Sequence, residues 1–191
     1  VFIADRDPFD GNFGVFDDSL PDGWGTLLLD RFLKEQGKDL SKLSILDRLS
    51  LIGSNGRGAL GYRPVNSFAA NAHFKDFDKI SSACQKILEE KKIDNGSLEE
   101  IYKNGGSSGG ARPKVFAKID GREWLVKFKS SFDPKDIGEI EYKYSLLAKK
   151  CQIEMPETRL INGKYFAVER FDRTPNGRVH TISASGLLNA Y

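Results

Sequence analysis

Hydrophobic side chains recur every three or four residues in several segments of the chain, the spacing of one buried face of an α-helix. Around Trp24, Leu28 and Phe32 this spacing predicts a helix over residues 22–36. The same spacing predicts further helical segments within residues 40–52, over 77–92, over 97–103 and over 137–151. Helices therefore dominate the first hundred residues.

Two pairs of short runs rich in β-branched and aromatic residues predict β-hairpins. Asp120-Gly121 joins the first pair and Asn162-Gly163 joins the second. Both dipeptides favour the two-residue turns that connect antiparallel strands. The hairpin strands are expected at residues 115–119 with 123–129, and at 159–161 with 165–171.

The order of elements sets the fold class. We expect an edge strand at the end of the glycine-spaced segment 56–62 and a further strand over 178–182. From residue 105 onward the order is then loop, hairpin, helix, hairpin and strand. A mostly antiparallel sheet with one inserted helix is α+β, because a doubly wound nucleotide fold would alternate strands and helices. The predicted parts are a helical unit at 1–66, a helical connection at 67–104 with a linker at 69–75, and a sheet-containing unit at 105–191.

Charge and composition exclude several classes of protein. Lys and Arg number 29 against 27 Asp and Glu, so no global field favours nucleic acid or an anionic membrane. No apolar stretch approaches the roughly 18 residues of a membrane helix, and we expect a cytoplasmic protein without a membrane partner. We expect Cys84 and Cys151 to be reduced and buried rather than disulfide-bonded. His73 and His180 lack the spacing of a zinc site.

A glycine- and serine-rich segment, residues 105–114, comes directly before a predicted strand. Glycine lets backbone N–H groups approach phosphates closely, and Arg112 and Lys114 add positive charge. The segment differs from a Walker A loop because no Gly-Lys-Ser/Thr ends it, and from a dinucleotide fingerprint because a strand follows it. Taken alone, it is equally typical of a phosphate-binding loop and of a flexible linker.

Lys127 is flanked by apolar residues on the second strand of the first hairpin. Most strand lysines only face water. This one follows the glycine-rich segment by one hairpin, and the next helix carries Glu139 and Glu141. A carboxylate on that helix can orient a phosphate-binding lysine, as in protein kinases. We favour Glu141, because its spacing from Ile137 and Tyr144 places it on their face of the helix.

A third candidate is the charged strand end at residues 167–173, which contains Glu169, Arg170 and Phe171. Backbone groups in such a position can pair with the edge of an adenine ring. From the pattern alone, an ordinary charged strand end is the simpler interpretation. We assign Asp172 a structural or hinge role, because a kinase catalytic base lies in a loop rather than in a strand end.

Five ordered motifs together resemble the HipA family of bacterial toxin kinases over nearly the whole chain. They are Leu20-Pro21-Asp22-Gly23-Trp24-Gly25 with Leu29-Asp30-Arg31, residues 53–62, residues 107–114, Leu125-Val126-Lys127-Phe128, and residues 168–173. The resemblance implies a kinase-like N-lobe after the helical unit, and an ATP- and Mg²⁺-dependent serine/threonine protein kinase. The family's known targets are aminoacyl-tRNA synthetases. A HipB-like antitoxin often accompanies these kinases, so contact with DNA would be indirect.

The same resemblance implies roles for individual residues. Lys127 would be the ATP lysine, and Glu169, Arg170 and Phe171 would meet adenine. Ser107 would be the serine whose autophosphorylation displaces the glycine-rich loop, with its neighbour Ser108 as the alternative. The residues expected to contact phosphates are Ser108, Gly109, Gly110, Ala111, Arg112, Pro113 and Lys114.

The chain departs from the family pattern at both ends. It starts without some of the family's N-terminal strands and stops at Tyr191, before the catalytic and metal-binding acids of a kinase C-lobe. We therefore expect the C-lobe to be absent and the Mg²⁺ ligands to lie outside these residues. Neither catalytic residues nor metal ligands are assigned here, and phosphate transfer by these residues alone is not expected.

The competing interpretation is a module that docks an antitoxin or another partner without binding nucleotide. The glycine-rich segment would then be only a hinge. An exposed apolar patch around Trp24 and Phe32 would favour this interpretation. Direct nucleic-acid binding through a small basic face at Arg57 and Arg63 ranks third.

Overall fold

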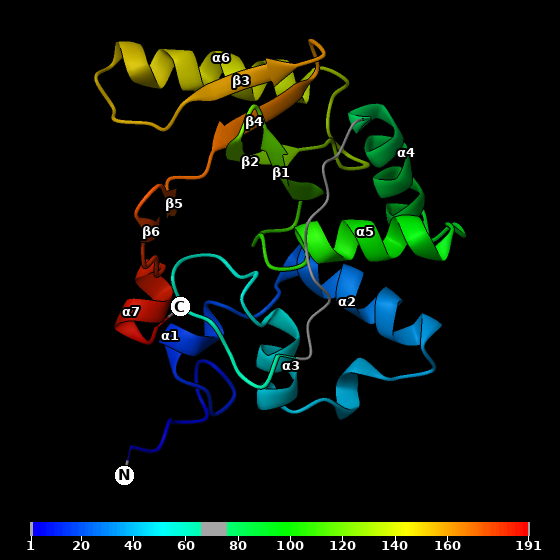
Figure 1. The fold of residues 1–191 in the computed structure, drawn as a ribbon, viewed down its shortest axis with the longest axis vertical. Coiled ribbons are helices and arrows are strands. Elements are labelled where there is room, and N and C mark those ends of the chain that lie inside the picture. Colours follow the sequence, from blue (N-terminus) through cyan, green and yellow to red (C-terminus); the bar gives the residue numbers. More distant parts are fainter. Residues whose placement is uncertain (1, 66–75, 191) are drawn as a thin grey trace.

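The computed structural model of the chain describes residues 2–65 and 76–190 (Figure 1), so the predicted linker at 69–75 and His73 lie outside the described residues. The N-terminal part is helical, as predicted. Its elements are α1 (Gly14–Asp17), α2 (Gly23–Glu35), the short 3₁₀ helix η1 (Leu40–Lys42) and α3 (Ile45–Ile52).

Two more helices, α4 (Phe77–Leu88) and α5 (Asn95–Gly105), precede the sheet. Helix α5 is longer than the predicted turn over 97–103. Asp94 caps its start by accepting the Ser97 amide at 2.8 Å, and α5 continues through Gly105. Because a side chain at position 105 would place its Cβ 2.5 Å from the Lys114 carbonyl oxygen, a glycine there lets α5 lie against the first strand.

The sheet confirms both predicted hairpins. Its order is β1-β2-β4-β3, and every pair is antiparallel. The strands are β1 (Lys114–Ile119), β2 (Arg122–Lys127), β3 (Thr158–Ile161) and β4 (Tyr165–Glu169). The turn residues Asp120 (φ 50°) and Gly121 (φ 80°), and likewise Asn162 (φ 52°) and Gly163 (φ 69°), have the positive φ that these turns require.

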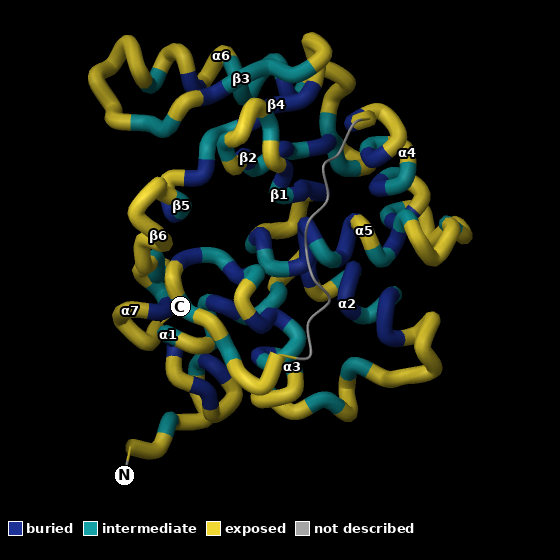
Figure 2. Tube along the Cα trace, in the orientation of Figure 1, coloured by how far each residue is buried: buried dark blue, intermediate teal, exposed yellow. Residues whose placement is uncertain are grey.

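Helices cover both faces of the sheet. Helix α6 (Ile137–Lys150) packs on β3 and β4, and α5 packs on β1 from the other side (Figure 1). Trp124, Val126 and Phe128 are buried on the α5 side. Figure 2 shows buried positions gathered between α2, α5 and β1. One hydrophobic core thus contains residues from all three predicted parts, among them Trp24, Leu98 and Trp124. The fold is α+β, as predicted.

Two predicted strands are wrong. Residues 56–62 contain no strand, because the backbone of Gly56 and Gly58 binds side chains of a distant segment instead of a neighbouring strand. The strand predicted over 178–182 is reduced to Gly177–Arg178 (β6), which pairs with Arg173–Thr174 (β5). Helix α7 (Ala184–Leu188) follows and packs against α1.

The two cysteines are free, as predicted, but their environments differ. Cys84 is buried, and burial raises the pKa of its thiol. Cys151 is exposed just after α6, so the prediction that it is buried is wrong. Across residues 2–65 and 76–190, no helix is both long enough and apolar enough to span a membrane.

Candidate functional site

The glycine-rich segment forms the connection between α5 and β1. Gly109 (φ 70°) and Gly110 (φ 79°) both have left-handed backbone conformations that favour glycine. Gly110, Ala111 and Arg112 are exposed, whereas Pro113 and Lys114 are buried where β1 begins. The segment is therefore an ordered loop fixed at both ends, with its tip open to solvent.

Lys127 points away from the α5 side of the sheet and toward α6. Its Nζ atom lies 3.1 Å from Oε2 of Glu141 and 5.2 Å from the centre of the Phe166 ring. Glu139 instead pairs with Lys143 on α6 itself, at 2.7 Å. The structure thus brings together the lysine and the glutamate that the sequence analysis selected.

The contact between Lys127 and Glu141 is an ion pair rather than a well-directed hydrogen bond. Oε2 of Glu141 is buried and has no hydrogen-bond partner, although the lysine ammonium lies 3.1 Å away. The carboxylate therefore keeps the capacity to accept a further hydrogen bond. Such a pair orients the ammonium without using all of its donors.

An open pocket of about 490 Å³ lies between the glycine-rich loop and this ion pair. Its lining combines loop backbone, cationic side chains and one apolar strand residue. The lining residues are Ser108, Gly109, Ala111, Arg112, Lys114, Leu125, Lys127 and Glu141. Three of these side chains, those of Arg112, Lys114 and Lys127, are cationic and one, that of Glu141, is acidic. The pocket therefore suits an anionic ligand.

The loop donors divide into engaged and available groups. Both the amide and the hydroxyl of Ser108 bond to the Gly105 carbonyl, and the Gly110 amide bonds to Asp22. Pro113 has no N–H. Within the described part of the chain, the amides of Gly109, Ala111 and Arg112 donate no hydrogen bond. Among the seven residues predicted to contact phosphates, Gly109, Ala111 and Arg112 are therefore the ones whose backbone amides are free to donate to a ligand.

Lys114 lines the pocket, and its ammonium donates to the Gly109 carbonyl. Burial lowers the pKa of Lys114 to about 8. The negative charges of Asp22 and Glu141 oppose this shift, whereas the nearby cations Lys127 and Arg57 add to it. Lys114 therefore loses its charge closer to neutral pH than an ordinary lysine does.

Arg112 also lines the pocket and pairs with two carboxylates. Its guanidinium is 2.8 Å from Asp133 and 3.7 Å from Glu141. Burial opposes the ionisation of Asp133, but hydrogen bonds from Ser130 and Arg112 outweigh it and keep the pKa of Asp133 below its usual value. Arg112 thus links the loop to the glutamate that faces Lys127.

Ser107 lies outside this pocket. Its hydroxyl donates to the Asn55 carbonyl at 3.3 Å, and it lines a separate small pocket with Asn55 and Tyr102. Ser108 is buried and lines the main pocket. The two adjacent serines therefore face different parts of the molecule.

The three residues predicted to contact adenine, Glu169, Arg170 and Phe171, have different environments in the structure. The Glu169 carboxylate lies 3.1 Å from Arg122, and Arg170 is buried over the Phe116 ring. Phe171 is 65% exposed. None of the three is among the residues that line the pocket next to Lys127.

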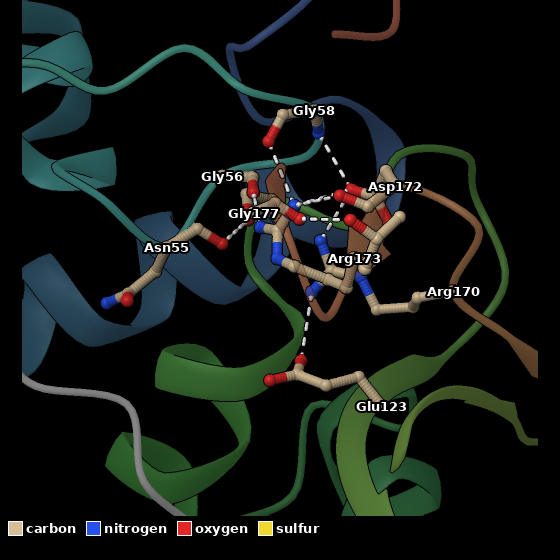
Figure 3. A network of polar contacts seen from close by, with 10 residues as sticks. Asn55, Gly56, Gly58, Glu123, Arg170, Asp172, Arg173 and Gly177 are labelled. Carbon is tan, nitrogen blue, oxygen red and sulfur yellow. Dashed lines mark hydrogen bonds and ion pairs between the residues drawn. The ribbon is translucent and has the colours of Figure 1, made fainter. Parts of the chain in front are cut away.

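Asp172 is the centre of a buried polar network (Figure 3). Its carboxylate accepts the Gly58 amide at 2.8 Å and bonds to Arg170 at 2.7 Å and to Arg173 at 2.9 Å. Arg173 also donates to the carbonyls of Gly58 at 2.9 Å and Gly56 at 2.7 Å. Burial disfavours the charge of Asp172, but the arginines hold its pKa below the usual value. This geometry agrees with the structural role assigned to Asp172.

Arg173 and Gly58 have no role among those predicted from the sequence. The available signal was that the segments 53–62 and 168–173 both belong to the motifs of one family. That signal could not show that the two segments touch.

Among the described residues there is no group of three or more His, Cys, Asp or Glu that could hold a metal ion.

Comparison with known proteins gave two family matches. The HipA N-terminal domain model matches residues 3–63, and the HipA-like C-terminal domain model matches residues 106–191. Searches of curated proteins and of solved structures found no match. The two matched regions contain all five motifs noted in the sequence. The chain therefore belongs to the HipA family, which is generally a family of serine/threonine kinases.

Proposed function

We propose that this chain contains the ATP-binding part of a HipA-like serine/threonine protein kinase, with residues 105–191 as a kinase-like N-lobe. The observation that carries the proposal is the ion pair between Lys127 and Glu141 beside the glycine-rich loop. In protein kinases a strand lysine and a helix glutamate form this pair, and the lysine contacts nucleotide phosphates. The triphosphate would lie along the free amides of Gly109, Ala111 and Arg112.

The full activity proposed is transfer of the ATP γ-phosphate to a serine or threonine of a protein target, aminoacyl-tRNA synthetases being the family's targets. Magnesium would accompany the nucleotide and neutralise phosphate charge. A HipB-like antitoxin is the proposed partner. Helices α2, α4 and α5 would support the N-lobe through the shared core.

We propose Ser107 as the regulatory phosphorylation site. Its hydroxyl is a donor to the Asn55 carbonyl. A phosphate group carries about two negative charges and acts mainly as an acceptor, so it cannot replace that donor. Phosphorylation would therefore release the loop from the segment around Asn55.

The proposal is tested by ATP binding. Lys127→Ala should weaken the binding of magnesium ATP, measured by calorimetry, by at least about tenfold, because a charge-assisted contact to phosphate is lost. Lys118→Ala, which removes an exposed lysine from the neighbouring strand, should bind like the parent chain. No binding by the parent chain, or equal binding by the Lys127 variant, would favour the docking module.

A second prediction follows from Lys114. ATP affinity should fall by about tenfold between about pH 7.5 and pH 9.5, as the ammonium with a pKa of about 8 loses its proton and its charge-assisted contact. ATP itself keeps a constant charge in this range. In Lys114→Arg the positive charge persists, and the affinity should be independent of pH. An unchanged slope in the arginine variant would assign the pH dependence to another group.

The alternative, a partner-docking module, predicted an exposed apolar patch around Trp24 and Phe32, and the described part of the structure does not contain it. Trp24 is 1% exposed and Phe32 is 5% exposed, and both belong to the hydrophobic core. An apolar docking patch needs exposed side chains. The patch that this interpretation required around Trp24 and Phe32 is therefore absent from the described surface.

A further inference from the structure

The start of helix α2 makes three hydrogen bonds with the glycine-rich segment, two of them at Gly110 in the loop tip and one at Lys114, where β1 begins. The Asp22 carboxylate accepts the Gly110 amide at 2.6 Å, and the Trp24 amide donates to the Gly110 carbonyl at 3.1 Å. The Trp24 indole N–H donates to the Lys114 carbonyl at 3.2 Å. Both backbone groups of Gly110 are therefore held by residues that come almost ninety positions earlier in the chain.

Two glycines allow this close approach. A Cβ on Gly23 would lie 2.7 Å from the Cα of Ala111, and a Cβ on Gly25 would lie 2.1 Å from the Gly106 carbonyl oxygen. Both neighbours are backbone atoms, which cannot turn aside as a flexible side chain can. Any residue other than glycine would push α2 away from the loop and separate Asp22 from Gly110.

The Asp22 side chain hydrogen-bonds to the glycine-rich loop rather than to its own helix. It occupies the N-cap position of α2, where an aspartate usually accepts an amide of its own first turn, yet it makes no such bond. Its carboxylate is directed to Gly110 instead. Replacing it therefore removes no helix cap, and because Asp22 is exposed, it empties no part of the core.

Asp22 and the residues of the proposed phosphate site line different pockets. Asp22 lines a pocket with Leu20 and Arg48, whereas it is not among the residues lining the pocket next to Lys127. Its negative charge also supports the protonated form of Lys114. Asp22 thus influences the groups that would meet phosphate without meeting the phosphate itself.

We propose that Asp22 is a positioning residue of the nucleotide site, which fixes Gly110 so that the neighbouring loop amides stay arranged for the phosphates of ATP. This inference rests on the proposed ATP binding and extends it. Helix α2 then becomes part of the nucleotide site, although it lies in the N-terminal unit.

The test compares ATP with adenosine, which lacks phosphates, as ligands of three variants. Asp22→Ala should weaken ATP binding by about tenfold and leave adenosine binding unchanged, because only the phosphate loop loses its support. Asp22→Asn keeps an oxygen that can accept the Gly110 amide and should bind ATP within about threefold of the parent. The matched control is Asp30→Ala, which removes a carboxylate that pairs with Lys34 elsewhere on α2 and should change neither affinity.

Asp22→Ser guards against a folding defect, since serine is a good N-cap residue but is too short to replace the carboxylate. It should reproduce the loss of ATP affinity with a thermal midpoint close to that of the parent. Parental ATP affinity in Asp22→Ala, or equal losses for ATP and adenosine, would overturn the positioning role while the Lys127 result stands. A folded parent chain that binds no ATP would overturn the proposed function, and this inference with it.

Discussion

Replacing Asp172 with asparagine is expected to lower the free energy of unfolding by about 3 to 5 kcal/mol. The carboxylate is buried and pairs with Arg170 and Arg173 while accepting the Gly58 amide. Asparagine keeps the shape but removes the negative charge. Among the described residues, Arg170, itself buried, then has only the more distant Glu123, at 3.6 Å, as an ion-pair partner. An uncompensated buried charge is among the most destabilising of single changes.

Urea unfolding, followed by tryptophan fluorescence, measures this loss. Asp120→Asn is the matched control, because it also removes a carboxylate that pairs with an arginine, Arg159 at 3.0 Å, but its side chain is 74% exposed. Exposed pairs contribute less than about 1 kcal/mol, and asparagine also suits this turn. Similar small losses in both variants would mean that the Asp172 network does not hold the segments 56–58 and 170–173 together.

Gly138→Ala is expected to destabilise the fold by about 2 kcal/mol and to weaken ATP binding by at least about tenfold. In most helices this change stabilises by up to about 1 kcal/mol, since alanine favours the helix more than glycine does. Here the new Cβ would lie 2.1 Å from the Lys164 carbonyl oxygen in the turn before β4. Helix α6 must then shift and carry Glu141 away from Lys127, and the clash outweighs the helix preference.

Gly96→Ala provides a matched control. Gly96 is the second residue of α5, as Gly138 is of α6, and the nearest atom to its added Cβ would lie at an ordinary 3.4 Å. This variant should be as stable as the parent chain or slightly more stable, with unchanged ATP affinity. Both variants would be compared by thermal unfolding and by calorimetric titration. A stable Gly138 variant that binds ATP normally would show that the position of α6 is not critical for the site.

These predictions share one structural cause. Helix α6 places Glu141, the start of α2 supports Gly110, and the segment 56–58 is locked to residues 170–173. Each contact joins segments that are distant in sequence. The proposed nucleotide site therefore depends on the packing of the whole chain and not only on the loop and the strand that line it.

Short-range patterns were enough to predict most helices and both hairpins, because helical spacing and Asp-Gly or Asn-Gly turns reflect the conformation of neighbouring residues. They were not enough for the segment 56–62. Its spaced glycines and the following Pro64 suggested a turn and an edge strand, but Gly58 takes a φ of 71° and bonds to Asp172 instead. The competing partner was more than a hundred residues away.

The sequence by itself determined the α+β class, the location of the glycine-rich loop and the choice of Lys127 with Glu141, since helix and strand periodicities fix which side chains share a face. Only the tertiary structure decided the β1-β2-β4-β3 order, the burial of Trp24, and the contact of Asp22 with Gly110. The physical reason is that local periodicity sets the direction of each side chain, whereas its partner depends on how distant segments pack to bury their apolar faces and to pair their polar groups.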